Sequence, residues 1–117
     1  MALDLNRGTI AWKVPFGDSP QLRAHPALKG AALPARLGAP GASGVIVTKS
    51  GVILGGGNDN ALNAFDASDG RELLRFVLPR EATGTPMTYL DAKGQQVIVM
   101  ATGRGEDTAL VAFRLEK

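Results

Sequence analysis

The sequence lacks cysteine altogether and carries a single histidine, His25, among its 117 residues. Without cysteine the chain forms no disulfide, has no thiolate nucleophile and offers no thiolate to a metal, and its redox compartment stays open. One imidazole, with no cysteine or second histidine to share the ion, does not make a transition-metal site. We therefore expect His25 to be an exposed loop residue.

Long apolar runs and a surplus of one charge are also missing. No stretch reaches the roughly 18 consecutive apolar residues of a membrane-spanning helix, and the N-terminus has no charged segment followed by an apolar one. The 13 Lys and Arg residues face 11 Asp and Glu, and the basic residues are scattered. Because nucleic-acid binding depends on clustered cations, we expect no nucleic-acid partner and no membrane contact by this segment.

Glycine and proline, by contrast, are abundant and fall between short apolar runs, with 15 Gly and 7 Pro in the chain. This punctuation is typical of strands and turns. Tight hairpin turns are indicated at Ser50-Gly51, Asp69-Gly70 and Lys93-Gly94, and consecutive hairpins make an antiparallel meander. The predicted strands are residues 2–5, 9–15, 45–49, 52–55, 61–66, 72–78, 86–90, 95–101 and 109–115.

Residues 16–44 are the exception to this pattern. They contain four prolines and show neither the strand period nor the helix period over any length. We expect a long loop here, and loops of this length inside a domain either line a ligand site or remain mobile.

One frame occurs twice in the chain: alanine, any residue, aspartate, three residues, glycine, three residues, and a large apolar side chain. The aspartate can bond its own turn, the glycine supplies a positive φ, and the large residue fills a gap between sheets. The frame predicts a strand, a turn and a return strand, and residues 109–115 begin a third copy. The two full copies are Ala2, Asp4, Gly8 and Trp12, and Ala64, Asp66, Gly70 and Leu74.

At these residues the sequence resembles the eight-bladed propeller dehydrogenases that use pyrroloquinoline quinone, whose blades carry this tryptophan-docking frame. The similarity covers nearly the whole chain, follows the C-terminal part of that family, and is nearest to its membrane-bound glucose dehydrogenase branch. It implies an all-β fold of antiparallel four-stranded propeller blades. The matching segments are residues 12–17, 37–40, 43–44, 47–48, 51–53, 58–66, 78–79, 82–89 and 94–99.

The resemblance also implies a cofactor site. In the family the quinone lies on the propeller axis beside a calcium or magnesium ion, and the aspartate of a Thr-x-Asp-Asn pattern approaches it. That aspartate falls on Asp59, with Asn60 beside it, and no catalytic or metal-binding residue is carried over. The chain departs from the family where Gly57 replaces the threonine, where Arg104 replaces the histidine of a Gly-Gly-His-Gly turn, and where Leu74 replaces the second docking tryptophan.

Several of these residues have plainer interpretations. Asp59 could be a turn aspartate, and Trp12 fits packing between blades better than stacking on a cofactor. The glycines at 55–57 could cradle a phosphate, but the Lys-Ser/Thr ending of a P-loop is missing, so a strand-ending turn is indicated. A Ser-His-Asp arrangement around His25 lacks the Gly-x-Ser-x-Gly elbow.

We predict a single partial propeller domain over residues 1–117, with strands of an incomplete blade at 1–16, the loop at 17–44, a full blade at 45–79 and an incomplete last blade at 84–117. Unfinished blades leave unpaired strand edges, so we expect a homo-oligomer formed through them.

Two functions stay open. The first is a C-terminal fragment of a quinone-dependent sugar or alcohol dehydrogenase, inactive alone and binding neither quinone nor calcium by itself, with a periplasmic location implied by the resemblance. The alternative is a non-catalytic β-sheet interaction module built from propeller blades.

Overall fold

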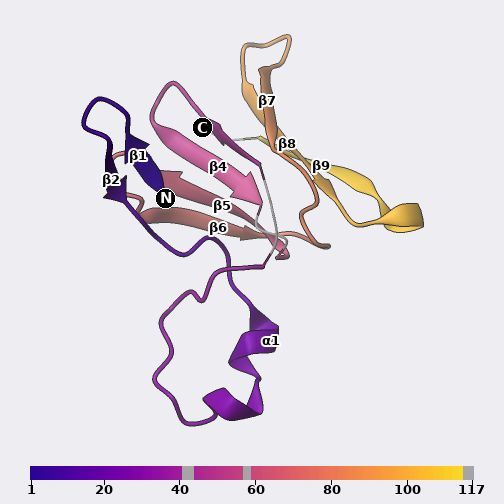
Figure 1. Cartoon of the computed structure of the whole chain (residues 1–117). Coiled ribbons are helices and arrows are strands. Elements are labelled where there is room, and N and C mark those ends of the chain that lie inside the picture. The colour runs from indigo at the N-terminus through magenta and orange to yellow at the C-terminus, as the bar shows by residue number, and fades with distance from the viewer. Residues whose placement is uncertain (41–43, 57–58, 115–117) are drawn as a thin grey trace.

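The computed structural model of the chain describes residues 1–40, 44–56 and 59–114. Within these residues, three antiparallel sheets of two, four and three strands follow one another along the chain (Figure 1). No helix among them is long and apolar enough to cross a membrane. In sheet order the strands are β1 (Ala2–Asp4) and β2 (Thr9–Trp12); β3 (Val45–Val47), β4 (Val52–Gly56), β5 (Ala61–Asp66) and β6 (Glu72–Val77); β7 (Met87–Leu90), β8 (Gln96–Thr102) and β9 (Ala109–Arg114).

Each strand predicted from the sequence is present, and the ends differ by a few residues at most. The largest difference is in β2, which ends at Trp12 instead of residue 15. Pro15 explains part of it, because proline has no N–H to give to a neighbouring strand. Leu115, the predicted end of the last strand, and Gly57 lie outside the described residues.

The two copies of the repeated frame have the same strand pairing. In each, the alanine faces the large apolar residue across the hairpin, and the register then shifts by one residue at the next pair. Such a shift strengthens the local twist of a hairpin. The pairs are Ala2 with Trp12 and Leu3 with Ile10 in the first sheet, and Ala64 with Leu74 and Phe65 with Glu72 in the second.

The turns of the two copies are also alike. The glycine N–H donates to the aspartate carbonyl at 2.8 Å in both, from Gly8 to Asp4 and from Gly70 to Asp66. Both glycines have positive φ, 66° and 74°. The aspartate carboxylates accept further backbone N–H groups inside their own turns. The prediction that the frame forms equivalent strand pairs is therefore confirmed.

Trp12 joins the first sheet to the second. Its indole Nε1 donates to the carbonyl of Ala67 at 3.0 Å, in the turn between β5 and β6. The ring lies against Gly70, where an added Cβ would collide with it. The large residue of one frame thus packs on the glycine of the next, whereas Leu74, at the corresponding place in the second copy, is 56% exposed.

A small apolar core lies between the second and third sheets. Leu62 of β5, Met100 of β8, Leu78 and Ala82 are buried together, with Phe113 of β9 partly buried against them. Gly56 belongs to the same contact, since a side chain there would meet Met100 and Ala82. Strand β5 is buried on both faces, because Leu62 faces this core while Phe65, on the opposite face, packs against Phe16.

The described chain is more open than its length suggests. Its radius of gyration is 15.7 Å, against about 13 Å for a compact domain of about this size. Large apolar side chains remain exposed on strands of all three sheets. They include Leu3, Ile10, Val47, Val77, Tyr89, Leu90 and Leu110.

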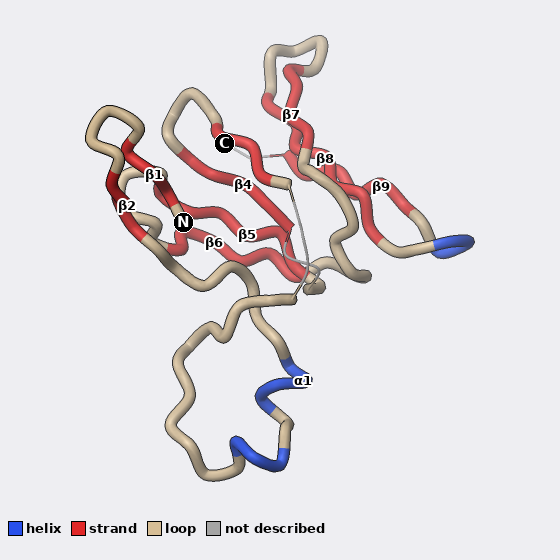
Figure 2. The backbone as a smooth tube through the Cα atoms, in the orientation of Figure 1, coloured by secondary structure: helices blue, strands red, loops and turns tan. Residues whose placement is uncertain are grey.

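The loop between β2 and β3 extends from one end of the second sheet and contains two short helical turns, α1 (Pro20–Arg23) and η1 (Pro26–Leu28) (Figures 1 and 2). Arg23 organises it. Its guanidinium donates to both carboxylate oxygens of Asp18, at 2.8 and 3.0 Å, and to the carbonyls of Pro34 and Ala35. Asp18 also accepts the N–H of Leu37 at 3.0 Å. The described part of the loop is thus closed on itself by one ion pair.

We expect Gly70→Ala to lower the free energy of unfolding by about 2–5 kcal/mol, because the alanine must adopt a positive φ and collide with Trp12. Gly94→Ala is the matched control, since Gly94 has nearly the same φ, 73°, and open space where its Cβ would lie. It should cost only about 1–2 kcal/mol. Urea unfolding followed by circular dichroism measures both, and equal losses would refute the contact.

The Asp18 pair should make stability fall in acid. Hydrogen bonds from Arg23 hold the pKa of the Asp18 carboxyl well below its usual range, against an opposing effect of partial desolvation, and the Leu37 amide adds to the lowering. A carboxyl whose folded pKa is lowered stabilises the fold above its unfolded pKa and loses that contribution as the pH falls toward the folded value. The loss should begin below about pH 5.

Asp18→Asn should therefore cost about 1–3 kcal/mol at pH 7 and flatten the pH dependence of the urea midpoint between about pH 5 and pH 2. The control is Asp107→Asn, since Asp107 is 77% exposed and lies 3.7 Å from its partner Arg80. An unchanged pH profile in Asp18→Asn would show that the pair does not hold the loop.

Candidate functional site

A cavity of about 540 Å³ lies between the loop and the second sheet. Its volume is in the range of small-molecule sites. The loop forms one wall, the connection between β4 and β5 and strand β6 form another, and the segment after β6 closes it. The residues that line it are Asp18, Ser19, Pro20, Gln21 and Pro40; Asp59 and Asn60; Arg75 and Val77; and Glu81.

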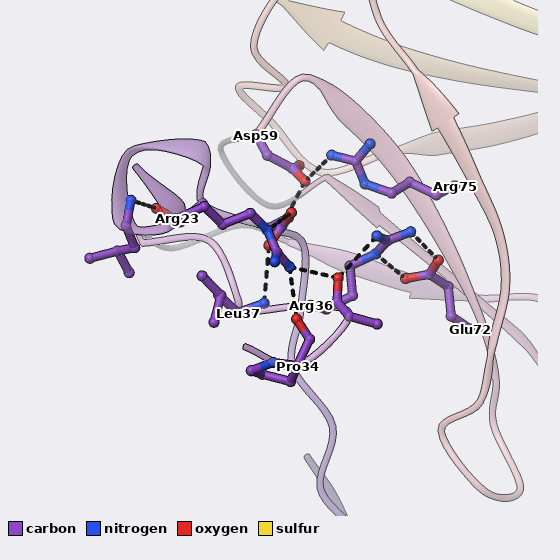
Figure 3. A network of polar contacts seen from close by, with 11 residues as sticks. Arg23, Pro34, Arg36, Leu37, Asp59, Glu72 and Arg75 are labelled. Atoms are coloured by element: carbon purple, nitrogen blue, oxygen red, sulfur yellow. Dashed lines mark hydrogen bonds and ion pairs between the residues drawn. The ribbon is translucent and has the colours of Figure 1, made fainter. Parts of the chain in front are cut away.

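Asp59 connects these walls. It is only 7% exposed, and its carbonyl accepts the N–H of Ala82 at 3.0 Å. One carboxylate oxygen, Oδ2, accepts the N–H of Asp18 at 3.2 Å and Nη2 of Arg75 at 3.0 Å (Figure 3). Gly17 is needed for this approach, because a Cβ there would lie 2.9 Å from the same oxygen.

Arg75 is a charged residue turned inward from a strand. It lies on β6 opposite Asn63 of β5, and its side chain is 22% exposed beside the 3% of Asp59. Removing one partner from such a buried ion pair is costly, because the remaining charge keeps no counter-charge. The sheet therefore depends on Asp59 and Arg75 being present together.

The pair is not fully hydrogen-bonded. Among the described residues, Asp59 Oδ1, Arg75 Nε and both amide atoms of Asn63 are buried without a partner. Native proteins leave few such atoms, and each one points to an interaction still to be made. The Asp59–Arg75 pair and the neighbouring Asn63 thus have hydrogen-bonding atoms beneath the cavity wall that the described residues leave unpaired.

A second ion pair fixes the loop on the sheet. Arg36 donates to both carboxylate oxygens of Glu72, at 3.0 and 2.8 Å, where β6 begins (Figure 3). The hydrogen bonds that Arg36 donates to the Glu72 carboxylate keep the pKa of the Arg36 guanidinium above its usual value. Together with the Asp18 to Asp59 bond, it places the loop as a wall of the cavity.

The sequence-predicted site residues lie as follows. Asp59 faces the cavity from a buried position, and Asn60 lines it from an exposed one. His25 is exposed, and its Nδ1 accepts the N–H of Ala27 at the start of η1. Trp12 is not on this cavity; it borders an apolar one of about 260 Å³ that Phe16 and Phe65 also line.

Sequence reasoning missed Arg75, which it grouped with scattered basic residues, and it missed the loop residues Asp18 and Ser19. A signal for Arg75 was available, since it is a single charge between two apolar pairs of a predicted strand, Leu73-Leu74 and Phe76-Val77, and a charge that turns inward there needs a partner. No comparable signal marks Asp18, because its partners come from distant segments.

Among the described residues, no group of three or more His, Cys, Asp or Glu side chains is placed to hold a metal ion. The carboxylates that line the cavity are each engaged by an arginine: Asp18 by Arg23, Asp59 by Arg75 and Glu81 by Arg104. The arrangement suits a ligand with several hydrogen-bonding groups better than a bare cation.

Comparison with known proteins agrees with this architecture. A family model described as the β-propeller domain of glucose, ethanol and alcohol dehydrogenases that use pyrroloquinoline quinone (PQQ) matches residues 1–98. The quinate/shikimate dehydrogenase (quinone) of Acinetobacter baylyi is 32% identical over 99% of this chain and 15% of its own length. Quinoprotein glucose dehydrogenase A of Acinetobacter calcoaceticus is 37% identical over 88% of this chain and 13% of its own. The quinoprotein glucose dehydrogenase of Escherichia coli is 34% identical over 87% and 13%.

The chain therefore spans about one seventh of the length of these relatives. The match covers all three sheets, including the repeated frames and the Asp59 segment, and it confirms the family and the all-β fold predicted from the sequence. This chain belongs to the family of PQQ-dependent dehydrogenase β-propeller domains.

Proposed function

We propose that this chain is part of a PQQ-dependent dehydrogenase that oxidises a sugar or alcohol, and that it lines the cofactor pocket without turning over substrate by itself. The observation that carries the proposal is the buried Asp59–Arg75 pair on the 540 Å³ cavity. Asp59 is the residue on which the family resemblance puts the aspartate that approaches the cofactor. Relatives that match most of the chain are named for quinate, shikimate, glucose and glycerol, and one that matches about half of it is named for 1-butanol; we take polyhydroxy compounds as the substrate class.

The residues around the cavity fit the functional groups of the cofactor. PQQ is a flat quinone with carboxylates on its rim, and it needs hydrogen-bond donors and a cation. Arg75 supplies a guanidinium, and Asn60 and Gln21 supply amide groups along the cavity. Calcium ligands are not part of the proposal for this chain.

When bound, PQQ supplies the two-electron acceptor for oxidation of the alcohol. The chain's own residues bind and orient. Arg75 would hold the cofactor by donating hydrogen bonds to it, and Asp59 keeps the guanidinium in place through Oδ2. Asp18 and Ser19 form the wall of the cavity on the side of the loop. Proton abstraction from the substrate is not assigned to this chain.

We propose, further, that Trp12 docks the first sheet on the second in the way that the family's blades are joined. Its hydrogen bond to the Ala67 carbonyl and its contact with Gly70 support this role.

The compartment proposed from the resemblance is the periplasm, and recovery of the native protein in the cytosolic fraction of its source cells would contradict it.

A chimera tests the proposed function. In it, this chain replaces the matching segment of the Acinetobacter calcoaceticus glucose dehydrogenase, and we expect glucose oxidation once PQQ and calcium are added. Asp59→Asn in the chimera leaves the Arg75 charge without its partner. It should raise the PQQ concentration needed for half-maximal activity by about tenfold or more.

Asp69→Asn is the control, because Asp69 is an exposed turn aspartate whose carboxylate accepts the N–H of Arg71, its neighbour but one in the same turn. It should leave the PQQ requirement unchanged. Equal PQQ requirements for Asp59→Asn and the parent chimera would remove Asp59 from the cofactor site.

The second candidate function is a β-sheet interaction module without chemistry, and the exposed apolar side chains on all three sheets favour it. The two candidates respond differently to ligand. In the glucose dehydrogenase chimera, where the rest of the pocket is present, a cofactor pocket raises the melting temperature when PQQ and calcium are added, because a ligand that binds the native state stabilises it. The module gives a flat response.

Under either function we propose that the chain self-associates through unpaired strand edges, which include β9. Light scattering at micromolar concentration should then report a dimer or larger species. Leu110→Lys puts a charge on the exposed side of β9, where Leu110 is 74% exposed, and should shift the chain toward monomer. Leu5→Lys, in the turn after β1, is the control and should leave the oligomeric state unchanged. A parent chain that is monomeric at this concentration would contradict the proposal.

A further inference from the structure

The buried cluster formed by Asp59, Asn63 and Arg75 contains matching donors and acceptors that are not yet joined. Four of its atoms are buried without a partner among the described residues. Asp59 Oδ1 and Asn63 Oδ1 are acceptors, whereas Arg75 Nε and Asn63 Nδ2 are donors. The cluster can therefore satisfy itself without any group from outside.

Asn63 has few other places to find a partner. It is fully buried, at 0% exposure, in the strand β5 that is covered on both faces. Its neighbour on β4 is Gly55, where a Cβ would lie 2.6 Å from the ring of Phe16. Phe65, on the same face of β5, packs on Phe16 with ring centroids 5.5 Å apart. The amide is thus shut off from solvent by apolar groups on that side.

Arg75 is a polar residue placed directly beside Asn63 on the neighbouring strand. Asn63 and Arg75 are direct partners in the register of β5 and β6, so their side chains leave the same face of the sheet. Opposed residues in an antiparallel pair have Cβ atoms about 4.5–5.5 Å apart, a spacing that an asparagine amide and an arginine Nε can bridge.

We infer that Asn63 is a positioning residue whose amide oxygen accepts the Nε–H of Arg75 and holds the guanidinium against Asp59. Arg75 is then held at two points, by Asn63 at Nε and by Asp59 at Nη2, and the rest of the guanidinium faces the cavity. The consequence for ligand binding rests on the proposed function: an oriented guanidinium meets a carboxylate without first losing rotational freedom.

The exchange of the Arg75 Nε proton with solvent tests the inference in the full chain, by nuclear magnetic resonance and without cofactor. The internal reference is Arg7, whose side chain is 81% exposed. The Arg75 proton should exchange about tenfold or more slowly than that of Arg7. Equal rates would overturn the inference.

Variants of Asn63 show whether slow exchange of the Arg75 Nε proton comes from the hydrogen bond or from burial alone. Asn63→Leu keeps the shape and removes the acceptor, so Arg75 exchange should accelerate by about tenfold or more. Asn63→Asp keeps an acceptor and should preserve the protection, while Asn6→Leu, in an exposed turn, is the control. The backbone amide spectrum shows whether each variant is folded. Protection that survives in folded Asn63→Leu, or is lost in folded Asn63→Asp, would refute the role.

In the glucose dehydrogenase chimera, Asn63→Leu should raise the PQQ requirement while changing kcat at saturating PQQ less than twofold. The two proposals fail separately. An inactive chimera with a protected Arg75 proton would refute the cofactor pocket and leave the role of Asn63 intact. An active chimera in which the Arg75 Nε proton exchanges as fast as that of Arg7 would refute the role of Asn63 and leave the cofactor pocket intact.

Discussion

The Asp59 carboxylate is the point at which three otherwise separate parts of the chain meet. Its Oδ2 accepts bonds from the Asp18 N–H in the loop and from Arg75 on β6, and its own carbonyl accepts the N–H of Ala82 from the segment leading to the third sheet. A buried carboxylate is tolerated only where such partners balance the cost of leaving water. The cavity exists because this one group draws loop, sheet and connection together.

The sheets themselves are held by a different kind of contact. Trp12 packs on Gly70 between the first and second sheets, and Leu62 and Met100 pack between the second and third. Both contacts place a large side chain against a glycine or alanine, so neighbouring sheets approach closely. Large apolar side chains nevertheless remain exposed on strands of all three sheets.

The cavity depends both on the Asp59 contacts and on the apolar contacts between sheets. Apolar contacts set the sheets side by side, and the spaces at their ends are then lined by whatever polar residues the strand ends and connections carry. Here these residues are Asp59, Asn60 and Arg75, with the loop as an outer wall. Asn63 belongs to the same arrangement, since its buried amide lies opposite the half-buried Arg75 in the strand register, where we propose that it orients the guanidinium.

Strand positions, the hairpin turns and the equivalence of residues 2–12 and 64–74 were determined by the sequence alone, because they depend on local periodicity and on glycine at positive φ. Asp59 was also found from the sequence, through the family resemblance. Only the tertiary structure decided that Arg75 and Asp18 meet Asp59, since they are 16 and 41 positions from it along the chain and reach it through strand register and loop closure. Strand register likewise decided that Asn63 lies opposite Arg75. The local sequence pattern predicts the strands, but it does not predict which charged residues pair, because the partners come together only in the folded chain.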